Sequence, residues 1–184
     1  MNHQRDYDIQ KTLQEMRDDY WRNLEVSEEQ EGELGEEYLV VRIDTQRYAM
    51  VASLCKEVIK PPELVRVPRT PAQIRGIFNL RGEIVAVTDL GPLLTGQQQQ
   101  LLKASRLVVV AHGALRTALL VGGVEGLTRI GGSQVEALAE GAAVGVRDMF
   151  AGKTLAENGT LMILDLARIL GRPELVIDQK GDSV

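Results

Sequence analysis

Residues 74–94 read IRGIFNLRGEIVAVTDLGPLL and carry the clearest fold signal in the chain. Two short apolar runs, residues 77–80 and 84–87, flank the pair Arg81–Gly82. Because glycine tolerates the positive φ that a tight turn requires, this pattern predicts a β-hairpin. Apolar groups lie on both faces of the second run, which is typical of a strand that lines a small barrel and is covered on its other side. Arg81 is then a charge at the tip of an otherwise apolar hairpin.

The end of this stretch has a counterpart later in the chain. Residues 82–94, GEIVAVTDLGPLL, and residues 159–170, GTLMILDLARIL, both run from a turn glycine through an apolar strand to Asp-Leu and two further apolar residues. Asp89 and Asp165 occupy equivalent places. Each is explained as a helix cap, whose carboxylate accepts hydrogen bonds from free N–H groups, rather than as half of a catalytic carboxylate pair. This twofold echo, with short strands and short helices, indicates a mainly β protein made of two small barrels packed together.

Alternating apolar residues and turn signals predict the remaining strands. These are residues 38–44 and 47–52 around a turn at Thr45–Gln46, then 53–60, 64–68, 105–113 and 115–130, the last with a bend at Gly122–Gly123. One turn of helix is expected after Pro71, and residues 96–100, GQQQQ, are expected to form an uninformative polar loop. The dipeptide Asn158–Gly159 predicts the turn of a closing hairpin, which a final short helix follows.

The N-terminal arm differs from the rest of the chain. An amphipathic helix near residues 8–24 is predicted by apolar residues at helical spacing, with Trp21 beside them: Ile9, Leu13, Met16, Tyr20 and Leu24. The acidic stretch 25–37 contains two glycines and predicts a flexible linker. Residues 1–37 carry 12 acidic and 4 basic residues, a net charge of -8, whereas residues 38–184 have a net charge of +3. The apolar stripe has two interpretations: it packs on the chain's own body, or it docks on a partner.

Composition favours an ordinary globular protein. The chain has 184 residues, 44% of them hydrophobic, which is enough for a core without disulfides or metal. Its single cysteine, Cys55, excludes an internal disulfide and fits a reducing cytoplasm. We find no signal-peptide pattern and no run of roughly 20 apolar residues, so a cytoplasmic protein without membrane insertion is expected. Aromatic residues make up 4% of the chain and no Lys/Arg stripe is present, which argues against nucleic-acid binding.

No pattern in the sequence points to catalysis. The histidines are His3 and His112, and neither has a second metal ligand at useful spacing. The glycines at 122, 123 and 126 lack the spacing and the strand-to-helix setting of a phosphate-binding loop. Cys55 has no histidine near it in sequence, and a lone cysteine among apolar residues is usually a packing residue. We therefore expect no metal, no cofactor and no enzymatic activity.

A family resemblance adds to this interpretation. Residues 66–90, RVPRTPAQIRGIFNLRGEIVAVTDL, closely resemble the most diagnostic segment of the CheW-like domain, which is found in bacterial chemosensory coupling proteins and in their histidine kinases. The positions in register are Val67, Pro68, Thr70, Pro71, Ile74, Gly76, Asn79, Leu80, Arg81, Gly82, Asp89 and Leu90. Weaker likeness extends over residues 37–170. The resemblance implies two interleaved SH3-like five-stranded β-barrels in residues 37–172, between an acidic helical arm and linker at 1–36 and a C-terminal tail at 173–184.

The same resemblance implies a function. It implies a non-enzymatic coupling protein that links the cytoplasmic tip of a methyl-accepting chemoreceptor to a CheA-type histidine kinase. It also implies an acid–arginine pair, Glu57 with Arg81, at the edge of the partner-binding surface. From the residues themselves, Glu57 lies in a candidate strand, and a guanidinium can hold a carboxylate with two parallel hydrogen bonds. The competing interpretation of the pair is an ordinary surface salt bridge worth under about 1 kcal/mol.

The remaining site assignments come from the resemblance as well. In CheW-like proteins a groove between the barrels receives the hairpin tip of the receptor, which implicates Cys55, Ile77 and Leu80 beside the charged pair. Cys55 stands where a larger aliphatic residue is common, so a shallower apolar contact is expected. Gly122 stands where Asp is frequent, which removes the basis for an acid-dependent contact there. Kinase binding is assigned to the exposed barrel ends, with residues 144–155 as candidates.

Two alternatives stay open. One is a paralogue in a chemosensory system with an output other than flagella, such as type IV pilus twitching, for which the N-terminal extension is a credible site of specialisation. The other is a β-barrel module that binds a small molecule or a peptide. The lack of clustered aromatic residues that would line a ligand cavity weighs against the second. For the coupling protein, the expected location is the cytoplasm, in association with membrane-anchored receptor arrays.

Overall fold

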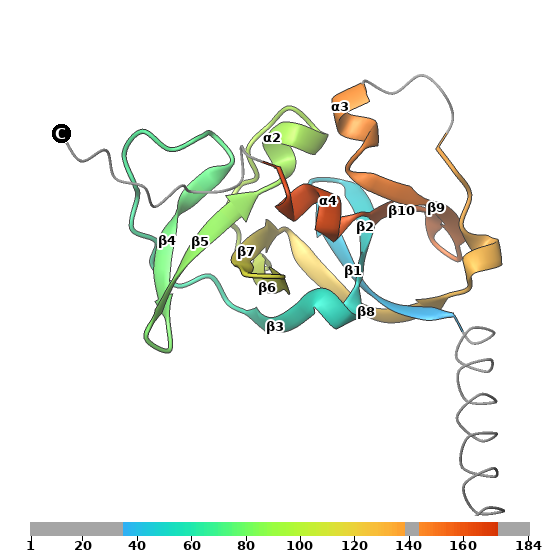
Figure 1. Ribbon diagram of the computed structural model, residues 1–184, viewed down its shortest axis with the longest axis horizontal. Coiled ribbons are helices and arrows are strands. Elements are labelled where there is room, and N and C mark those ends of the chain that lie inside the picture. Colours follow the sequence, from blue (N-terminus) through green and yellow to red (C-terminus); the bar gives the residue numbers. More distant parts are fainter. Residues whose placement is uncertain (1–34, 139–143, 173–184) are drawn as a thin grey trace, which may run out of the picture.

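The protein folds into two five-stranded β-sheets with a few short helices (Figure 1). The computed structural model describes residues 35–138 and 144–172, so the helix expected near residues 8–24 lies outside the described residues. The terminal sheet has the strand order β8-β1-β2-β10-β9, and the central sheet has the order β3-β6-β7-β5-β4. In chain order, the five strands of the central sheet come between β2 and β8 of the terminal sheet. The predicted mainly β, interleaved fold is therefore confirmed.

The strands are short and lie between tight turns. In the terminal sheet they are β1 (Glu36–Ile43), β2 (Gln46–Val51), β8 (Gly123–Ile130), β9 (Phe150–Ala156) and β10 (Gly159–Leu164). In the central sheet they are β3 (Cys55–Ile59), β4 (Ile74–Leu80), β5 (Glu83–Asp89), β6 (Arg106–His112) and β7 (Leu115–Val121). The helices are α2 (Gly91–Leu94), α3 (Val144–Arg147) and α4 (Leu166–Leu170), with 3-10 turns η1 (Ala52–Leu54) and η2 (Gly132–Gln134). No helix among the described residues is both long and apolar enough to cross a membrane.

The twofold echo in the sequence corresponds to a repeated strand arrangement. β5 pairs antiparallel with β4 and parallel with β7. In the same way, β10 pairs antiparallel with β9 and parallel with β2. α2 follows β5 and α4 follows β10 (Figure 1). In both copies a hairpin delivers an apolar strand next to a parallel partner and ends in a short helix.

Each sheet curls so that its two edges approach each other. The segment after β3 forms a bridge between Val65 and Ile77 of β4, with hydrogen bonds of 2.9 and 2.8 Å. The segment after β8 forms the corresponding bridge between Glu136 and Lys153 of β9, with hydrogen bonds of 2.8 and 2.9 Å. These bridges support the expected SH3-like barrels, whose full closure stays a prediction.

The largest core cluster joins the two sheets. It combines Val41 and Met50 of the terminal sheet with Val110 and Leu119 of the central sheet, and Leu90 before α2 belongs to it as well. Two smaller clusters fill the individual sheets. Because buried side chains of both sheets share one contiguous cluster, the two sheets pack as one unit.

Three local predictions are wrong. The turn between β1 and β2 is formed by Asp44 and Thr45, with Asp44 at a φ of 54°, and not by Thr45–Gln46. Residues 64–68 form a single bridge in place of a strand, because proline has no N–H to donate to a ladder and Pro68 closes this segment. The residues after Pro71 form a turn and no helix.

The strand predicted over residues 115–130 is interrupted at Gly122, where the chain changes sheet. β7 belongs to the central sheet and β8 to the terminal sheet. The Gly122 N–H donates to the Arg42 carbonyl at 2.7 Å, which ties the crossing point to β1. The predicted bend at Gly122–Gly123 is therefore confirmed, but it separates two strands of different sheets.

Asp89 and Asp165, which occupy equivalent places in the two similar segments, have different structural roles. Asp165 caps α4 as predicted, because its Oδ1 accepts the Arg168 N–H at 3.0 Å. Asp89, in contrast, is fully buried, and the N-cap of α2 is Leu90. Its carboxylate accepts four hydrogen bonds of 2.9 to 3.0 Å, from Arg75 Nη1, Gly91 N, Gln99 N and Gln99 Nε2. Asp89 thus holds together β4, the start of α2 and the loop that follows.

The glutamine loop at residues 96–100 is more than a polar connection. Gln99 is only 8% exposed, and its Nε2 donates to Asp89 and to the Leu120 carbonyl. Gln98 Nε2 donates to the Ala72 carbonyl at 3.0 Å. A run of four glutamines has no periodicity that would single out one of them. The burial of Gln99 is therefore decided by the fold.

Candidate functional site

The tip of the β4–β5 hairpin holds Arg81 in an outward position. Arg81 has a φ of 54° and Gly82 has a φ of 95°. A two-residue turn with positive φ at both positions matches the twist of the flanking strands. The Asn79 Oδ1 accepts the Gly82 N–H at 2.7 Å and fixes the turn further. The Arg81 side chain is 75% exposed, so a guanidinium reaches solvent at the end of the hairpin.

Glu57 and Arg81 form the pair that the family resemblance implies. Arg81 Nη1 donates to Glu57 Oε1 at 2.9 Å, and Nη2 donates to Oε2 at 2.8 Å. The planar guanidinium matches the carboxylate, so the two parallel bonds fix the direction of both side chains. Glu57 lies on β3, whose register with β6 shifts between Cys55 and Glu57. Such a bulge changes where the following side chains point.

Arg116 and Glu83 extend this pair. Arg116 Nη2 lies 3.7 Å from Glu57 Oε1, and Arg116 Nη1 pairs with Glu83. We call Glu57, Arg81, Glu83 and Arg116 the charged cluster. Its positive and negative charges alternate and cancel. Because an exposed ion pair contributes at most about 1 kcal/mol to stability, the cluster matters more for the positions of its side chains than for the free energy of unfolding.

Sequence reasoning missed Arg116 and Glu83. Each stands near the start of an apolar strand, β7 or β5, where a charged residue is unremarkable. The two strands run parallel, with Ala86 opposite Thr117, and this pairing brings their starts together. A parallel pairing between strands some 30 residues apart leaves no local mark in the sequence. The available signal was weak: a charge at the start of each of two apolar strands.

The three apolar candidates differ in burial and in the face on which they lie. Leu80 is 9% exposed and packs with Phe78 in the core of the central sheet. Ile77 is half-buried on the opposite face of β4, since residues of a strand alternate between faces. Cys55 is half-buried against the core cluster that joins the sheets. Leu80 therefore offers little surface to a partner, whereas Glu57 and Arg81 remain directly in contact with each other.

Other aliphatic side chains of the central sheet are exposed instead. Val58 is 43%, Val65 is 63% and Ile84 is 65% exposed. Within strand-like patterns, apolar residues are read as core, so the sequence did not distinguish these three from buried ones. In the segment 144–155, Leu155 is 83% exposed, while Met149 is buried. These side chains are apolar surface that a partner could cover.

Cys55 is expected to be a slow thiol in the folded chain. Burial raises the pKa of the Cys55 thiol to about 11, and its Sγ donates to the Val51 carbonyl at 3.5 Å. Because the thiolate is the nucleophile, roughly one thiol in a thousand is reactive at pH 8. We expect an aromatic disulfide reagent at pH 8 to label the folded chain at least about tenfold more slowly than the chain in denaturant, where the pKa is about 8.5. Equal labelling rates, followed by absorbance, would contradict this assignment.

No group of three His, Cys, Asp or Glu side chains that could hold a metal ion is found in residues 35–138 and 144–172. His112 is exposed at the end of β6.

The chain is similar to known proteins over most of the described residues. Residues 37–174 match the CheW-like domain. The chain is 24% identical over 138 residues to the chemotaxis protein CheW of Bacillus subtilis, covering 75% of this chain and 88% of that protein. It is 28% identical to the chemotaxis protein CheW of Thermotoga maritima, covering 73% and 87%. It is 30% identical over 95 residues to protein FrzA of Myxococcus xanthus, covering 52% and 59%.

A solved structure has the same fold. The scaffolding protein TtCheW from Thermoanaerobacter tengcongensis superposes with a TM-score of 0.65 at 23% sequence identity. The match covers 72% of this chain and 85% of that one. At this level of identity the likeness concerns the fold, and it agrees with the two five-stranded sheets described above.

Proposed function

The chain belongs to the CheW-like domain family, and from this membership we propose that it is a non-enzymatic coupling protein of bacterial chemosensory signalling. In this proposal it links the cytoplasmic tip of a methyl-accepting chemoreceptor to a CheA-type histidine kinase. Receptor conformation then biases kinase activity through the adaptor. The protein would work in the cytoplasm, beside membrane-anchored receptors, and would need no cofactor.

The observation that carries the proposal is the Glu57–Arg81 pair at the hairpin tip. The two side chains hold each other with bonds of 2.9 and 2.8 Å, yet the Arg81 side chain stays 75% exposed. An ion pair in this setting stabilises the fold little, but it presents a guanidinium and a carboxylate in fixed directions. Such an arrangement suits recognition of a partner, because charges at an interface give specificity and orientation.

The fold suits an adaptor. The two sheets share one core cluster, so surfaces on both keep a constant separation when partners bind. Modest interfaces on such a unit gain strength when many copies assemble side by side, because each later contact forms at high effective concentration. Exposed Leu155 on β9 and exposed Ile84 on β5 are candidate apolar contacts on the two sheets.

A binding experiment tests the proposal. The full chain, immobilised, should retain the histidine kinase and the receptor fragment encoded beside it, separately and together. Retention of both at once identifies an adaptor, because a protein that binds both through one surface cannot bridge them. Failure to retain either partner under low-salt conditions would remove the proposal.

The output of the signalling system is a separate question. The alternative to a role in flagellar chemotaxis is that the chain is a paralogue in a non-flagellar system, such as pilus-driven motility. Both assignments use the same charged cluster and the same fold. Deletion of the gene, followed by assays of swimming and of twitching, distinguishes them.

We also propose that the domain spans residues 37–172, with an arm at 1–36 that selects or regulates partners and a tail at 173–184. The match over residues 37–174 supports the body boundaries. β1 begins at Glu36, and its pairing with β8 runs from Glu36 opposite Ile130, so deleting residues 1–35 leaves the ladder intact. Residues 1–37 carry a net charge of -8, whereas residues 38–184 have a net charge of +3.

Deletion of residues 1–35 is therefore expected to change partner affinity by about threefold or more at low salt, with a smaller change at high salt, because salt screens charge–charge contributions. The melting temperature should change little. Affinity is measured by calorimetry against the kinase fragment at two salt concentrations. Unchanged affinity together with unchanged stability would remove the proposal for the arm.

A further inference from the structure

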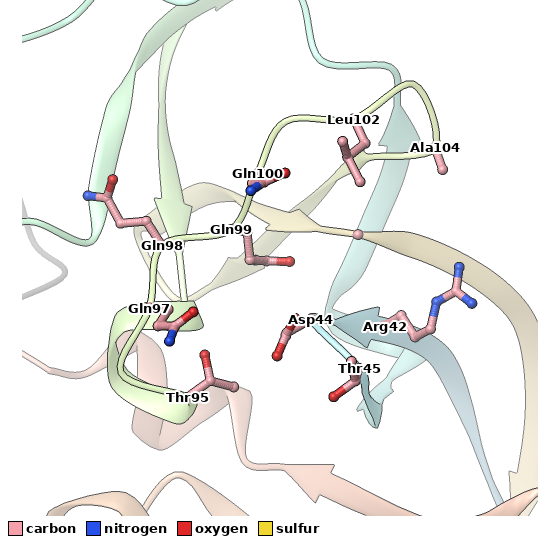
Figure 2. A pocket seen from close by; sticks show the side chains of 11 residues that line it. Arg42, Asp44, Thr45, Thr95, Gln97, Gln98, Gln99, Gln100, Leu102 and Ala104 are labelled. Carbon is pink, nitrogen blue, oxygen red and sulfur yellow. The ribbon is translucent and has the colours of Figure 1, made fainter.

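A pocket of about 630 Å³ lies where the two sheets meet, and none of the residues that line it belongs to the charged cluster. One wall is the end of β1 and the turn after it, with Arg42, Asp44 and Thr45. The other wall is the segment between α2 and β6, which contributes Thr95 and the glutamine loop, and Gly122 closes the pocket at the sheet crossing. Figure 2 shows these side chains around a common space, with Gln99 reaching into it from the loop.

The side chain of Gln99 has a fixed orientation. Its Nε2 donates one hydrogen bond to Asp89 Oδ1 at 3.0 Å and another to the Leu120 carbonyl at 2.7 Å. Both partners are acceptors, so turning the amide over would place oxygen against oxygen. Asp89 is in turn held by Arg75. The amide oxygen of Gln99 must therefore point away from this network.

That oxygen is a buried acceptor without a donor. Among the described residues, no hydrogen-bond partner reaches Gln99 Oε1, although the residue is only 8% exposed. A buried polar atom without a partner is unfavourable, and native proteins satisfy nearly all of them. Gly122 stands beside it: a Cβ on this residue would lie 3.8 Å from Gln99 Oε1. A polar side chain at residue 122 would therefore be in reach of this oxygen, and glycine leaves the oxygen without such a donor.

The pocket also carries one charge of each sign. Arg42 and Asp44 line it, and neither has an ion-pair partner in residues 35–138 and 144–172. Figure 2 shows Arg42 at the edge of the space and Asp44 nearer to Gln99 and Thr95. Apart from Leu102, Ala104 and Gly122, the lining residues are polar or charged, and their carbon atoms also line the space.

We propose that this pocket binds a small zwitterion of the size of an amino acid or dipeptide. The ammonium group donates to Gln99 Oε1 and to the Asp44 carboxylate, and the carboxylate of the ligand faces the Arg42 guanidinium. The size of the pocket lies within the range of small-molecule sites. The site uses none of the residues of the charged cluster. Binding of this ligand can therefore be tested independently of the proposed coupling function.

Glycylglycine serves as the probe because it carries both charges, with ethylamine and acetate as single-charge controls. The full chain, labelled with ¹⁵N, is titrated to about 50 mM, enough to saturate a site of millimolar affinity. With glycylglycine, we expect saturable chemical-shift changes of the Gln99 side-chain amide and the Gly122 backbone amide. With either control compound, the apparent affinity obtained from these changes should be at least about fivefold weaker. No saturable shift, or equal responses to all three compounds, overturns the proposal.

Asp44→Asn removes one charge of the pocket without touching the core, because Asp44 is exposed. It should weaken glycylglycine binding about fivefold or more, since a charge-assisted hydrogen bond becomes a neutral one. Asp148→Asn is the matched control, because Asp148 is also exposed and does not line the pocket. Equal affinities of the two variants would contradict the assigned role of Asp44.

Gly122→Ser and Gly122→Ala test the unpartnered oxygen directly. Gly122 does not have a left-handed φ, and a Cβ there meets Arg42 O at 3.4 Å, so both variants should fold. The serine hydroxyl can donate to Gln99 Oε1, whereas alanine cannot. We expect the serine variant to melt about 2–4 °C higher than the alanine variant and to lose glycylglycine binding. A serine variant no more stable than the alanine variant, and still binding the probe, overturns the inference.

Discussion

Arg81→Glu is expected to abolish stable binding of the proposed kinase or receptor partner, with a loss of affinity of more than about 30-fold. The substitution places a carboxylate beside Glu57 at the hairpin tip, where the guanidinium now makes bonds of 2.9 and 2.8 Å. A hot-spot arginine at an interface typically contributes about 2 kcal/mol or more, which corresponds to that loss. The melting temperature should fall only slightly, because the Arg81 side chain is 75% exposed and Glu57, which is 19% exposed, keeps Arg116 at 3.7 Å.

Arg168→Glu provides the matched control. Arg168 is 64% exposed and pairs with Asp165 at 3.1 Å, so it offers a similar charge reversal at a site away from the charged cluster. It should leave partner binding within about twofold of the unaltered chain. Affinity is measured by calorimetry and stability by thermal melting. Were Arg81→Glu to unfold the chain, or to bind as well as Arg168→Glu, the pair would be a structural contact and no recognition element.

Charge exchange sharpens the same test. The double variant Glu57→Arg with Arg81→Glu can rebuild the internal pair with its direction reversed, while Arg116 then faces a like charge. If the pair acts on a partner, binding stays lost although the pair is restored. If the pair only shapes the hairpin, binding returns. A double-mutant cycle separates the two outcomes.

Asp89→Ala is expected to destabilise the fold by about 3–5 kcal/mol and to lower the melting temperature by about 10 °C or more. Asp89 is fully buried and accepts four hydrogen bonds. Removing the carboxylate leaves Arg75, whose side chain is 23% exposed, with a largely buried charge. It also leaves the backbone N–H of Gly91 and of Gln99, and one side-chain N–H of Gln99, without an acceptor. Urea denaturation measures the change in free energy.

Asp165→Ala is the natural comparison, because Asp165 is the counterpart of Asp89 in the twofold echo. It accepts one backbone hydrogen bond, from Arg168 N at 3.0 Å, and its side chain is 24% exposed. Loss of a helix cap typically costs about 1 kcal/mol. Similar losses for the two variants would contradict the distinction between a buried network and a simple cap.

The hairpins and the echo could be predicted because their signals are local. A turn glycine between two apolar runs specifies the hairpin at Arg81–Gly82 and a second hairpin next to Gly159, whose turn is formed by Glu157 and Asn158, one residue earlier than predicted. The repeated Asp-Leu ending predicted two related units, and the structure has two sheets with the same strand arrangement. The Glu57–Arg81 pair came from the family resemblance, since 24 residues of sequence separation say nothing about contact.

The buried role of Asp89 and Gln99, the inward turn of Leu80 and the contact of Arg116 with Glu57 could not be predicted. An apolar residue in a strand pattern can be buried, as Leu80 is, or exposed, as Ile84 is. The sequence does not distinguish the two cases, because burial depends on which face of the strand its neighbours cover. Gln99 is one of four consecutive glutamines, and its burial depends on contacts with Arg75 of β4 and Leu120 of β7, which lie far from it in the sequence.

The sequence by itself determined the β class, the positions of the main turns, the charged hairpin tip and, through its motif, the family. Tertiary structure alone decided which side chains share a site. The reason is that turns and strand periodicity depend on residues within a few positions of one another. The charged cluster and the Gln99 pocket, in contrast, form where strands distant in the chain pair and where the chain changes sheet at Gly122.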